Sequence, residues 1–338
     1  MLSAHMHTIS RFTIFLLLVS LAYLPACKKA SPSGAAESKL IVLLSSDAQQ
    51  PYEKLQTQML TRIALNRAGF SLKSLDAAGS AEKQSQQLTG VLAEKPFAIL
   101  LAPVDPGTLE AAIPKAVNDG VLVIGLGESA TPLPCTSTLS VDQHQLGRLA
   151  GEIAVRSLTL KAKEEAKSDA IGRIVELRGD ENSPLCKARH EGFMEELGKS
   201  PGLVLVHDAP GNWTRQGGKD RAAEALRLQN SFDVIYAHND AMALGAGTAL
   251  GSQRQQVLII GTDGFQGEEG GLSLVNSGEI DASIYQPPLI DLAWMIILRS
   301  AEDPTFTPKP KYKVAPTSIT PKTVEDLRRN GPPPLPAL

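Results

Sequence analysis

From residue 39 onward, short apolar runs alternate with longer amphipathic stretches. The apolar runs are continuous rather than interrupted at every second position, which is typical of strands buried on both faces of a parallel sheet. They predict nine strands, at residues 39–45, 70–75, 97–102, 121–126, 171–177, 203–208, 232–237, 256–262 and 280–285. About four strands precede residue 140 and about five follow it, so the pattern predicts an α/β protein with two doubly wound parallel-sheet lobes.

The stretches between the predicted strands have helical periodicity. Residues 53–69 place Leu55, Met59 and Ile63 on one face, and Gly69 ends the predicted helix. Residues 330–338, NGPPPLPAL, are rich in proline and predict an extended tail.

The N-terminal segment has a different pattern. The apolar run from Phe12 to Leu24 is short for a membrane span and has the length of a signal-peptide core. The stretch that ends at Cys27, LPAC, resembles the lipobox of bacterial lipoproteins, which implies that residues 1–26 are removed and that Cys27 is lipidated. An ordinary secretory signal and a retained membrane anchor stay open as alternatives. Residues 27–38 are small and polar, as in a flexible tether.

Charge and cysteine content restrict the partners. The 338 residues carry a net charge of −3 without a long basic run, which disfavours a nucleic-acid partner because phosphate binding needs clustered positive charge. If Cys27 is lipidated, Cys135 and Cys186 remain. Two thiols in an oxidising compartment can pair, but sequence alone leaves this question open because it does not give the distance between them.

Polar side chains recur just after the predicted strands. In chain order they are Ser46, Gln50 and Tyr52, then Gly127 and Glu128, then Arg189, Trp213, Asn239 and Asp240, Asp263, and Gln286. All of them follow the same end of their strands. Because doubly wound sheets bind ligands at the carboxyl ends of the strands, we expect these side chains to meet in one crevice.

Four stretches carry a family resemblance: AHNDAMALGA (237–246), IGTDG (260–264), RHEGF (189–193) and YQPP (285–288). Together and in their order along the chain, they resemble the type I periplasmic sugar-binding proteins, the ribose-binding-like receptors of ABC transporters. The resemblance runs from about Lys39 to about Ala315. It implies ligand-binding roles for Arg189, Trp213, Asn239, Asp263 and Gln286 in the second lobe and hinge, and for Ser46, Gln50 and Tyr52 in the first lobe.

The chemistry of these residues suits a polyol. Carboxylates, amides and guanidinium groups are the partners that sugar hydroxyls need, and Trp213 and Tyr52 supply aromatic planes for the apolar face of a ring. Each residue also has a purely structural alternative. These are a solvated helix charge for Arg189, a surface loop residue for Trp213, a helix N-cap for Asn239 or Asp240, shaping of the glycine turn for Asp263, and a plain hinge residue for Gln286. The resemblance favours Asn239 as the ligand-binding residue and Asp240 as the cap.

Three residues depart from the resembled family. Gly127 and Glu128 stand where its closest members have an Asp-Arg pair that grips sugar hydroxyls, and Glu53 replaces a first-lobe aromatic residue. We therefore expect acidic groups, Glu53 and Glu128, to enter the pocket, and a ligand other than ribose, with an amine or a different ring. The alternative is that Glu128 pairs with Arg189 or faces solvent.

The resemblance also implies a domain layout with three hinge crossings. They lie near Ser140–Asp142, Gln286–Pro288 and Lys313–Pro316. The expected divisions are a signal peptide (1–26), a tether (27–38), an N-terminal lobe (39–141 plus 288–312), a C-terminal lobe (142–286 plus 313–329) and a tail (330–338).

The expected function is capture of a sugar or polyol on the periplasmic side of a bacterial membrane and delivery to an ABC-transporter permease. A receptor for a sensor kinase or chemoreceptor is the alternative. We expect no enzyme activity, cofactor or metal, and contact with the membrane through a lipid anchor only.

The stretch GLGESA (125–130) matches a dinucleotide-binding pattern, but Pro132 and Pro134 stand where its helix would have to begin. Cys186 and His190 are spaced to share a metal ion, but two ligands do not make a zinc site.

Overall fold

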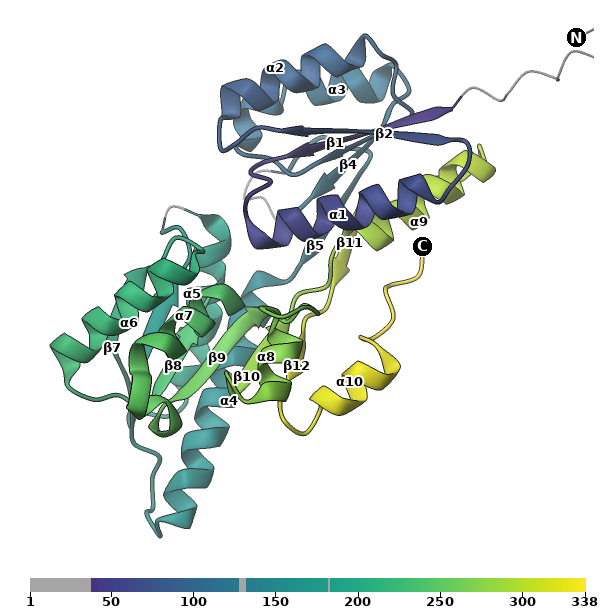
Figure 1. Ribbon diagram of the computed structural model, residues 1–338. Helices are drawn as coiled ribbons and strands as arrows, with labels where there is room; N and C mark the ends of the chain where they lie inside the picture. The colour runs from purple at the N-terminus through teal and green to yellow at the C-terminus, as the bar shows by residue number, and fades with distance from the viewer. Residues whose placement is uncertain (1–37, 128–131, 182) are drawn as a thin grey trace, which may run out of the picture. The chain divides into compact units, whose positions relative to one another are not determined.

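The computed structural model describes residues 38–127, 132–181 and 183–338. Cys27, Glu128, the expected signal peptide and nearly all of the expected tether lie outside the described residues. The described part contains two six-stranded sheets with helices on both faces (Figure 1). This confirms the prediction of two parallel-sheet α/β lobes.

The first sheet is entirely parallel and has the order β11-β5-β4-β3-β1-β2. Its strands are β1 (Lys39–Ser45), β2 (Phe70–Asp76), β3 (Ala98–Leu101), β4 (Leu122–Leu126), β5 (Ser137–Val141) and β11 (Lys311–Val314). Helices α1 (Pro51–Leu65) and α9 (Ile290–Glu302) cover one face, and α2 (Ala81–Leu92), α3 (Ala112–Asn118) and the 3-10 turn Pro106–Leu109 cover the other.

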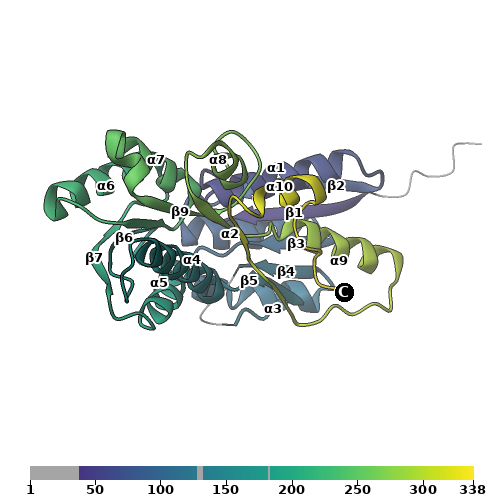
Figure 2. The ribbon, with the colours of Figure 1, turned by 90° about the horizontal axis from the view of Figure 1, so that it is seen from below.

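The second sheet has the order β12-β10-β9-β8-β6-β7, and only β12 runs antiparallel to its neighbour. Its strands are β6 (Gly172–Arg178), β7 (Leu203–Pro210), β8 (Val234–Ala237), β9 (Leu258–Asp263), β10 (Ala282–Tyr285) and β12 (Thr317–Ile319). Helices α4 (Gln143–Glu164) and α5 (Pro184–Leu197) pack on one face. The other face carries α6 (Arg215–Gln229), α7 (Asp240–Leu250), the 3-10 turn Gly251–Gln256 and α8 (Gly271–Ser277), with α10 (Val324–Asn330) packed beside α8 (Figure 2).

The chain passes between the two sheets at three places: after β5, after β10, and between β11 and β12. The residues that divide the lobes stay a prediction. Three of the four strands that flank these passages, β5, β11 and β12, were not among the nine predicted strands, whereas β10 was. They are short and mix polar with apolar residues, for example KYKV in β11, so they lack the apolar run that marks the buried strands.

Local sequence explains where the first helix begins. Pro51 occupies its first turn, where a missing backbone N–H costs nothing, so α1 starts two residues before the predicted helix and ends at Leu65. After α10, the residues 331–338 contain neither helix nor strand, and Leu335 and Leu338 pack against the core of the first lobe. Within the described residues, no helix combines the length and the apolar character needed to cross a membrane.

Candidate functional site

The loop between β1 and α1 is organised by Glu53. Its carboxylate accepts hydrogen bonds from the backbone N–H and the hydroxyl of Ser46 and from the N–H of Asp47, with N···O distances of 2.8 Å and 3.3 Å for the two backbone donors. Burial raises the pKa of Glu53 to about 7, although these hydrogen bonds act in the opposite direction. Gln50 donates from Nε2 to Asp47 at 3.0 Å. These first-lobe side chains are therefore engaged within their own loop, and their role in ligand binding stays a prediction.

Tyr52 connects this loop to the second sheet. Its hydroxyl donates to the carbonyl oxygen of Pro287 at 2.9 Å, and its ring stacks on Phe265 with a centroid distance of 5.7 Å. Burial raises its pKa, a hydrogen bond with Gln286 opposes this shift, and the carboxyl of Asp263 adds to it. Tyr52 thus lies close to two of the predicted second-lobe residues.

Arg189 lies at the centre of the predicted site. It projects from α5, and only 2% of its surface is exposed, so its alternative role as a solvated helix charge is wrong. Its Nε donates to Gln143 Oε1 at 2.8 Å, one terminal nitrogen to the carbonyl oxygen of His238, and the other to Gln286 Oε1 at 2.7 Å. The guanidinium is held by three elements distant in sequence, which fixes its orientation before any ligand arrives.

Trp213 covers the Arg189 guanidinium. The centre of the guanidinium is 5.3 Å from the ring centroid of Trp213, a cation–π distance. Trp213 adopts a left-handed backbone conformation with φ of 63°, and its ring packs on Gly179 so closely that a Cβ there would lie 2.2 Å from two ring carbons. The loops after β6 and β7 therefore place this half-buried aromatic surface beside Arg189.

The roles of Asn239 and Asp240 differ from the expectation. Asn239 is the N-cap of α7, since its Oδ1 accepts from the Met242 N–H at 2.8 Å, while its Nδ2 donates to the carbonyl oxygen of Trp213 at 2.8 Å. The prediction that Asp240 is the cap is wrong. Its buried carboxylate instead accepts from Ser283 Oγ at 2.6 Å and from two glycine N–H groups. Asn239 uses one of its two amide hydrogens on Trp213, which leaves the other for a ligand.

Asp263 ends β9 in a conformation rare for a residue with a side chain, with φ of 102°. Its surface is 6% exposed, and among the described residues its carboxyl group has no hydrogen-bond partner. Burial and the nearby Asp240 raise its pKa well above the ordinary value, while Arg189 opposes the shift. The neighbouring Gln286 donates its backbone N–H to the Asp263 carbonyl at 3.0 Å.

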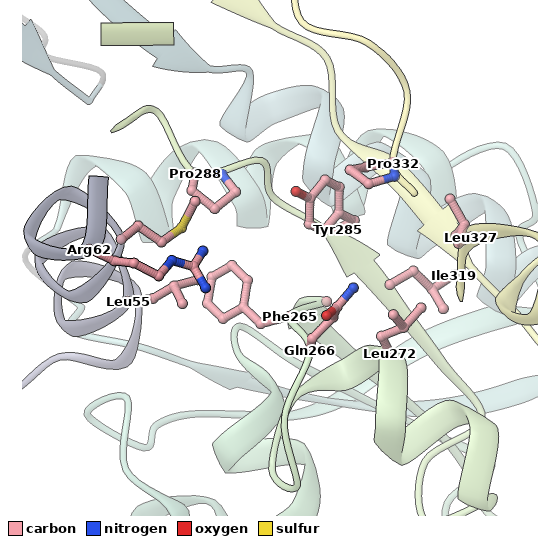
Figure 3. A pocket seen from close by; sticks show the side chains of 12 residues that line it. Leu55, Arg62, Phe265, Gln266, Leu272, Tyr285, Pro288, Ile319, Leu327 and Pro332 are labelled. Atoms are coloured by element: carbon pink, nitrogen blue, oxygen red, sulfur yellow. The ribbon is translucent and has the colours of Figure 1, made fainter. Parts of the chain in front are cut away.

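A cavity lies beside this cluster. It has a volume of about 310 Å³ and is lined by Leu55, Met59, Arg62, Gly264, Phe265, Gln266, Leu272, Tyr285, Pro288, Ile319, Leu327 and Pro332 (Figure 3). None of the predicted ligand residues lines it. Its walls are mostly apolar and offer few partners for hydroxyl groups, so its chemistry does not suit a polyol.

One group of possible metal ligands occurs among the described residues: Glu176, His190 and Asp208, whose ligand atoms lie within 4.8 Å of one another. These side chains already have charged partners, because His190 Nδ1 lies 2.6 Å from Glu176 and Asp208 lies 2.5 Å from Arg178. We interpret the group as an ion-pair network. Cys135 and Cys186 are free thiols, which answers the question of their pairing.

Comparison with known proteins shows which family this chain belongs to. Residues 41–297 match the family described as periplasmic binding protein domain. The chain belongs to this family. The resemblance to type I periplasmic sugar-binding proteins that the motifs indicated is thereby confirmed.

Individual relatives are distant in sequence and close in fold. The ribose import binding protein of Bacillus subtilis is 24% identical over 291 residues, covering 86% of this chain and 90% of that protein. The Caulobacter myo-inositol binding protein, solved with bound myo-inositol, superposes with a TM-score of 0.74 at 22% identity over 89% of this chain and 99% of that one. The fructose binding periplasmic domain of a hybrid two component system superposes with a TM-score of 0.73 at 22% identity, covering 87% and 94% of the two chains.

Sequence reasoning missed several residues that build the site. Gln143 follows the predicted first hinge crossing and accepts from Arg189, and Phe265 follows Asp263 by two residues and stacks on Tyr52. An aromatic residue directly after the IGTDG motif was a usable signal for Phe265. Glu176 lies inside a predicted strand, and only its charge within an apolar run marked it as unusual.

Proposed function

We propose that this periplasmic binding protein is an extracytoplasmic receptor for a sugar or sugar-like polyol, which it delivers to an ABC-transporter permease. The observation that carries the proposal is the carboxyl of Asp263, a residue that is 6% exposed, lies beside Arg189 and Tyr52, and has no hydrogen-bond partner for its carboxyl among the described residues. A buried polar group without a partner calls for an explanation, and a hydroxyl-rich ligand supplies the missing donor. The Trp213 ring offers an apolar surface for the carbon face of such a ligand.

The arrangement supports binding rather than bond cleavage. Arg189, Asn239 and Gln286 are held by hydrogen bonds to the protein, as binding residues of fixed geometry would be. Ligand bound between two lobes favours a closed form, and it does so only by binding that form better than the open one. In this proposal the protein makes and breaks no bond and uses no cofactor or metal.

A thermal-unfolding screen of residues 28–338 tests the proposal. The panel contains pentoses, hexoses, amino sugars, polyols and nucleosides. A ligand at about 100 times its Kd adds roughly 2.7 kcal/mol to the free energy of unfolding, which is a readily measured shift. A flat response to every sugar and polyol would contradict the proposal.

A second function has one supporting observation, the similarity in fold to a periplasmic sensor domain of a two component system. In that case the closed form signals to a sensor rather than to a permease. Uptake of the labelled ligand by cells that lack this gene separates the two: loss of uptake supports transport, while normal uptake with a lost transcriptional response supports sensing.

We also propose that Cys27 is lipidated, so that the receptor stays attached to the periplasmic side of the envelope. The proposal rests on the LPAC stretch. Mass spectrometry of the mature N-terminus measures the modification directly, and Cys27→Ser should release the protein from the membrane fraction. Retention of this variant in the membrane would indicate an uncleaved anchor.

A further inference from the structure

A fully buried carboxylate, Glu176, lies on β6, next to the edge strand β7 of the second sheet, and its hydrogen bonds among the described residues are to two histidines. Neither the residue nor its side chain is exposed. Its Oε2 lies 2.6 Å from His190 Nδ1, and its Oε1 lies 2.9 Å from His238 Nε2. Such a charge is costly to bury, so its two partners must compensate for the lost water.

The two histidines are the chain neighbours of two predicted ligand residues. His190 directly follows Arg189 on α5, and His238 directly precedes Asn239 at the end of β8. Arg189 in turn donates to the carbonyl oxygen of His238. The contacts therefore form a closed ring that runs from Glu176 to His190, along the backbone to Arg189, across to His238, and back to Glu176.

The protonation states in this ring follow from burial and charge. Burial alone would raise the pKa of Glu176, but the hydrogen bonds from His190 and His238 lower it to about 2, so the carboxylate is ionised and accepts both bonds. Burial lowers the pKa of His238, which is neutral and donates from Nε2; its Nδ1 has no partner among the described side chains and backbone. The hydrogen bond to Glu176 raises the pKa of the partly exposed His190, which carries the positive charge.

We propose that Glu176 is a positioning residue for the ligand site, and that it holds Arg189 and Asn239 in place through an ion pair with His190 that weakens when His190 loses its proton. The proposal rests on the function proposed above. It extends that function from the side chains that face the ligand to a buried group that sets their geometry and makes affinity depend on pH.

The sign of the pH dependence is fixed by His190. Its pKa in the folded protein lies above the ordinary value of 6.5, so the ion pair is complete below that pH and is lost as the pH rises through the higher folded value. The charged groups that face His190 are Glu176 and Arg178 from β6 and Asp208 from β7. Arg189, Arg178 and Glu176 act on His238.

Asp240 and Asp263 also have raised pKa values, so the wild-type profile contains their titration as well. The informative quantity is therefore the difference between the profiles of the wild type and of variants in the ring. Charge-assisted hydrogen bonds are roughly twice as strong as neutral ones. We therefore expect Kd to rise about three- to tenfold as the pH rises and His190 loses its proton, and we call this part of the profile the His190 limb.

The experiment measures Kd by calorimetry between about pH 5.5 and pH 8.5, with a sugar that stabilises wild-type residues 28–338 in the thermal screen. Glu176→Gln should weaken binding about tenfold near pH 6 and remove the His190 limb. His190→Gln changes a partly exposed side chain and should remove the same limb, which keeps the test valid if Glu176→Gln folds poorly. Glu195→Gln is the matched control on α5, the helix of His190, because it breaks an exposed pair with His144 of α4 and should leave the profile unchanged.

The possible outcomes are distinct. A purely structural role for Glu176 would lower the melting temperature of the variants while their pH profiles stay parallel to the wild-type profile, and that result would overturn the inference while leaving the proposed function intact. If the wild type binds no sugar or polyol of the panel, the proposed function falls, and the inference falls with it.

Discussion

The β1–α1 loop of the first lobe and the Arg189 cluster of the second lobe satisfy their polar groups in different ways. In the loop, Glu53 bonds to Ser46, seven residues away. In the Arg189 cluster, which comprises Arg189, Gln143, His238 and Gln286, the bonds of Arg189 join residues 46 to 97 positions apart. The hydrogen bonds of Glu53 are local in sequence, whereas the Arg189 cluster exists only when the second lobe is folded.

This difference assigns different tasks to the two regions. Arg189 is 2% exposed and its guanidinium donates to three oxygen atoms, so it offers a ligand a fixed charge at little ordering cost. The β1–α1 loop is half-buried. Among the predicted ligand residues in and next to this loop, Tyr52 is the one with described contacts to residues that follow the strands of the second sheet, Pro287 and Phe265. We expect changes in the cluster to affect stability and binding together, and changes in the loop to separate them.

The largest effect is expected for Arg189→Leu. The change removes three hydrogen bonds that Arg189 donates inside the folded lobe, together with the positive charge beside Asp240 and Asp263. We expect the free energy of unfolding to fall by about 3–5 kcal/mol, measured by urea denaturation, and sugar binding to be lost. Lys187→Leu is the control on the same helix, where the side chain is exposed and a change within about 0.5 kcal/mol is expected. Equal losses in both variants would contradict the buried role of Arg189.

Glycine substitutions compare the packing of the two lobes. A Cβ at Gly192 on α5 would lie 2.0 Å from the carbonyl oxygen of His144 on α4, and so would push apart the helices that carry Arg189 and Gln143. Gly192→Ala should cost about 2–3 kcal/mol in thermal or urea unfolding and should weaken sugar binding. Gly90→Ala lies in α2 of the first lobe with nothing within 4 Å, so it should raise stability by about 0.5–1 kcal/mol. If Gly192→Ala leaves stability unchanged or raises it, as expected for Gly90→Ala, the close approach of α4 and α5 is not tight.

The loop is expected to show its own pH dependence through Glu53. Its pKa is about 7 in the folded chain and 4.5 without the fold, so between these values the native state keeps a proton that the unfolded chain has lost. The free energy of unfolding therefore falls as the pH rises through this window. Glu53→Gln should reduce that fall by about 1–2 kcal/mol, measured by urea unfolding at pH 4.5 and pH 8. Glu82→Gln, an exposed first-turn carboxylate on α2, should leave the fall unchanged.

The same contrast explains what could be predicted from the sequence. The nine apolar runs each contain a strand because a buried strand must be apolar wherever it lies in the chain. The short strands β5, β11 and β12 lack such runs, because they are partly polar and owe their pairing to the neighbouring sheet. The pattern of apolar runs therefore predicts the architecture of the two lobes, but it does not predict β5, β11 and β12, three of the four strands next to the crossings.

For the site, the family motifs placed Arg189, Asp263 and Gln286 near one another, but not their partners. Whether Asn239 or Asp240 caps α7 depends on the extended backbone at Asn239 and on the glycine N–H groups of distant loops that bind Asp240. Neither feature can be predicted from the residue types at positions 239 and 240. The ring through Glu176 was hidden for the same reason, since its members come from three separate elements.

The smallest expected effect concerns the contacts of Tyr52 with Pro287 and Phe265. Tyr52→Phe removes the hydroxyl bond to Pro287 but keeps the ring against Phe265, so stability should fall by about 1 kcal/mol and sugar binding should weaken about two- to fivefold. Tyr312→Phe is the matched control, because its hydroxyl accepts a backbone hydrogen bond from Lys309 within the first lobe. It should lower stability by a similar amount in thermal unfolding and leave Kd unchanged. If Tyr52→Phe changes stability without changing Kd, Tyr52 joins the lobes structurally, and the first lobe contributes to binding through other residues of the β1–α1 loop.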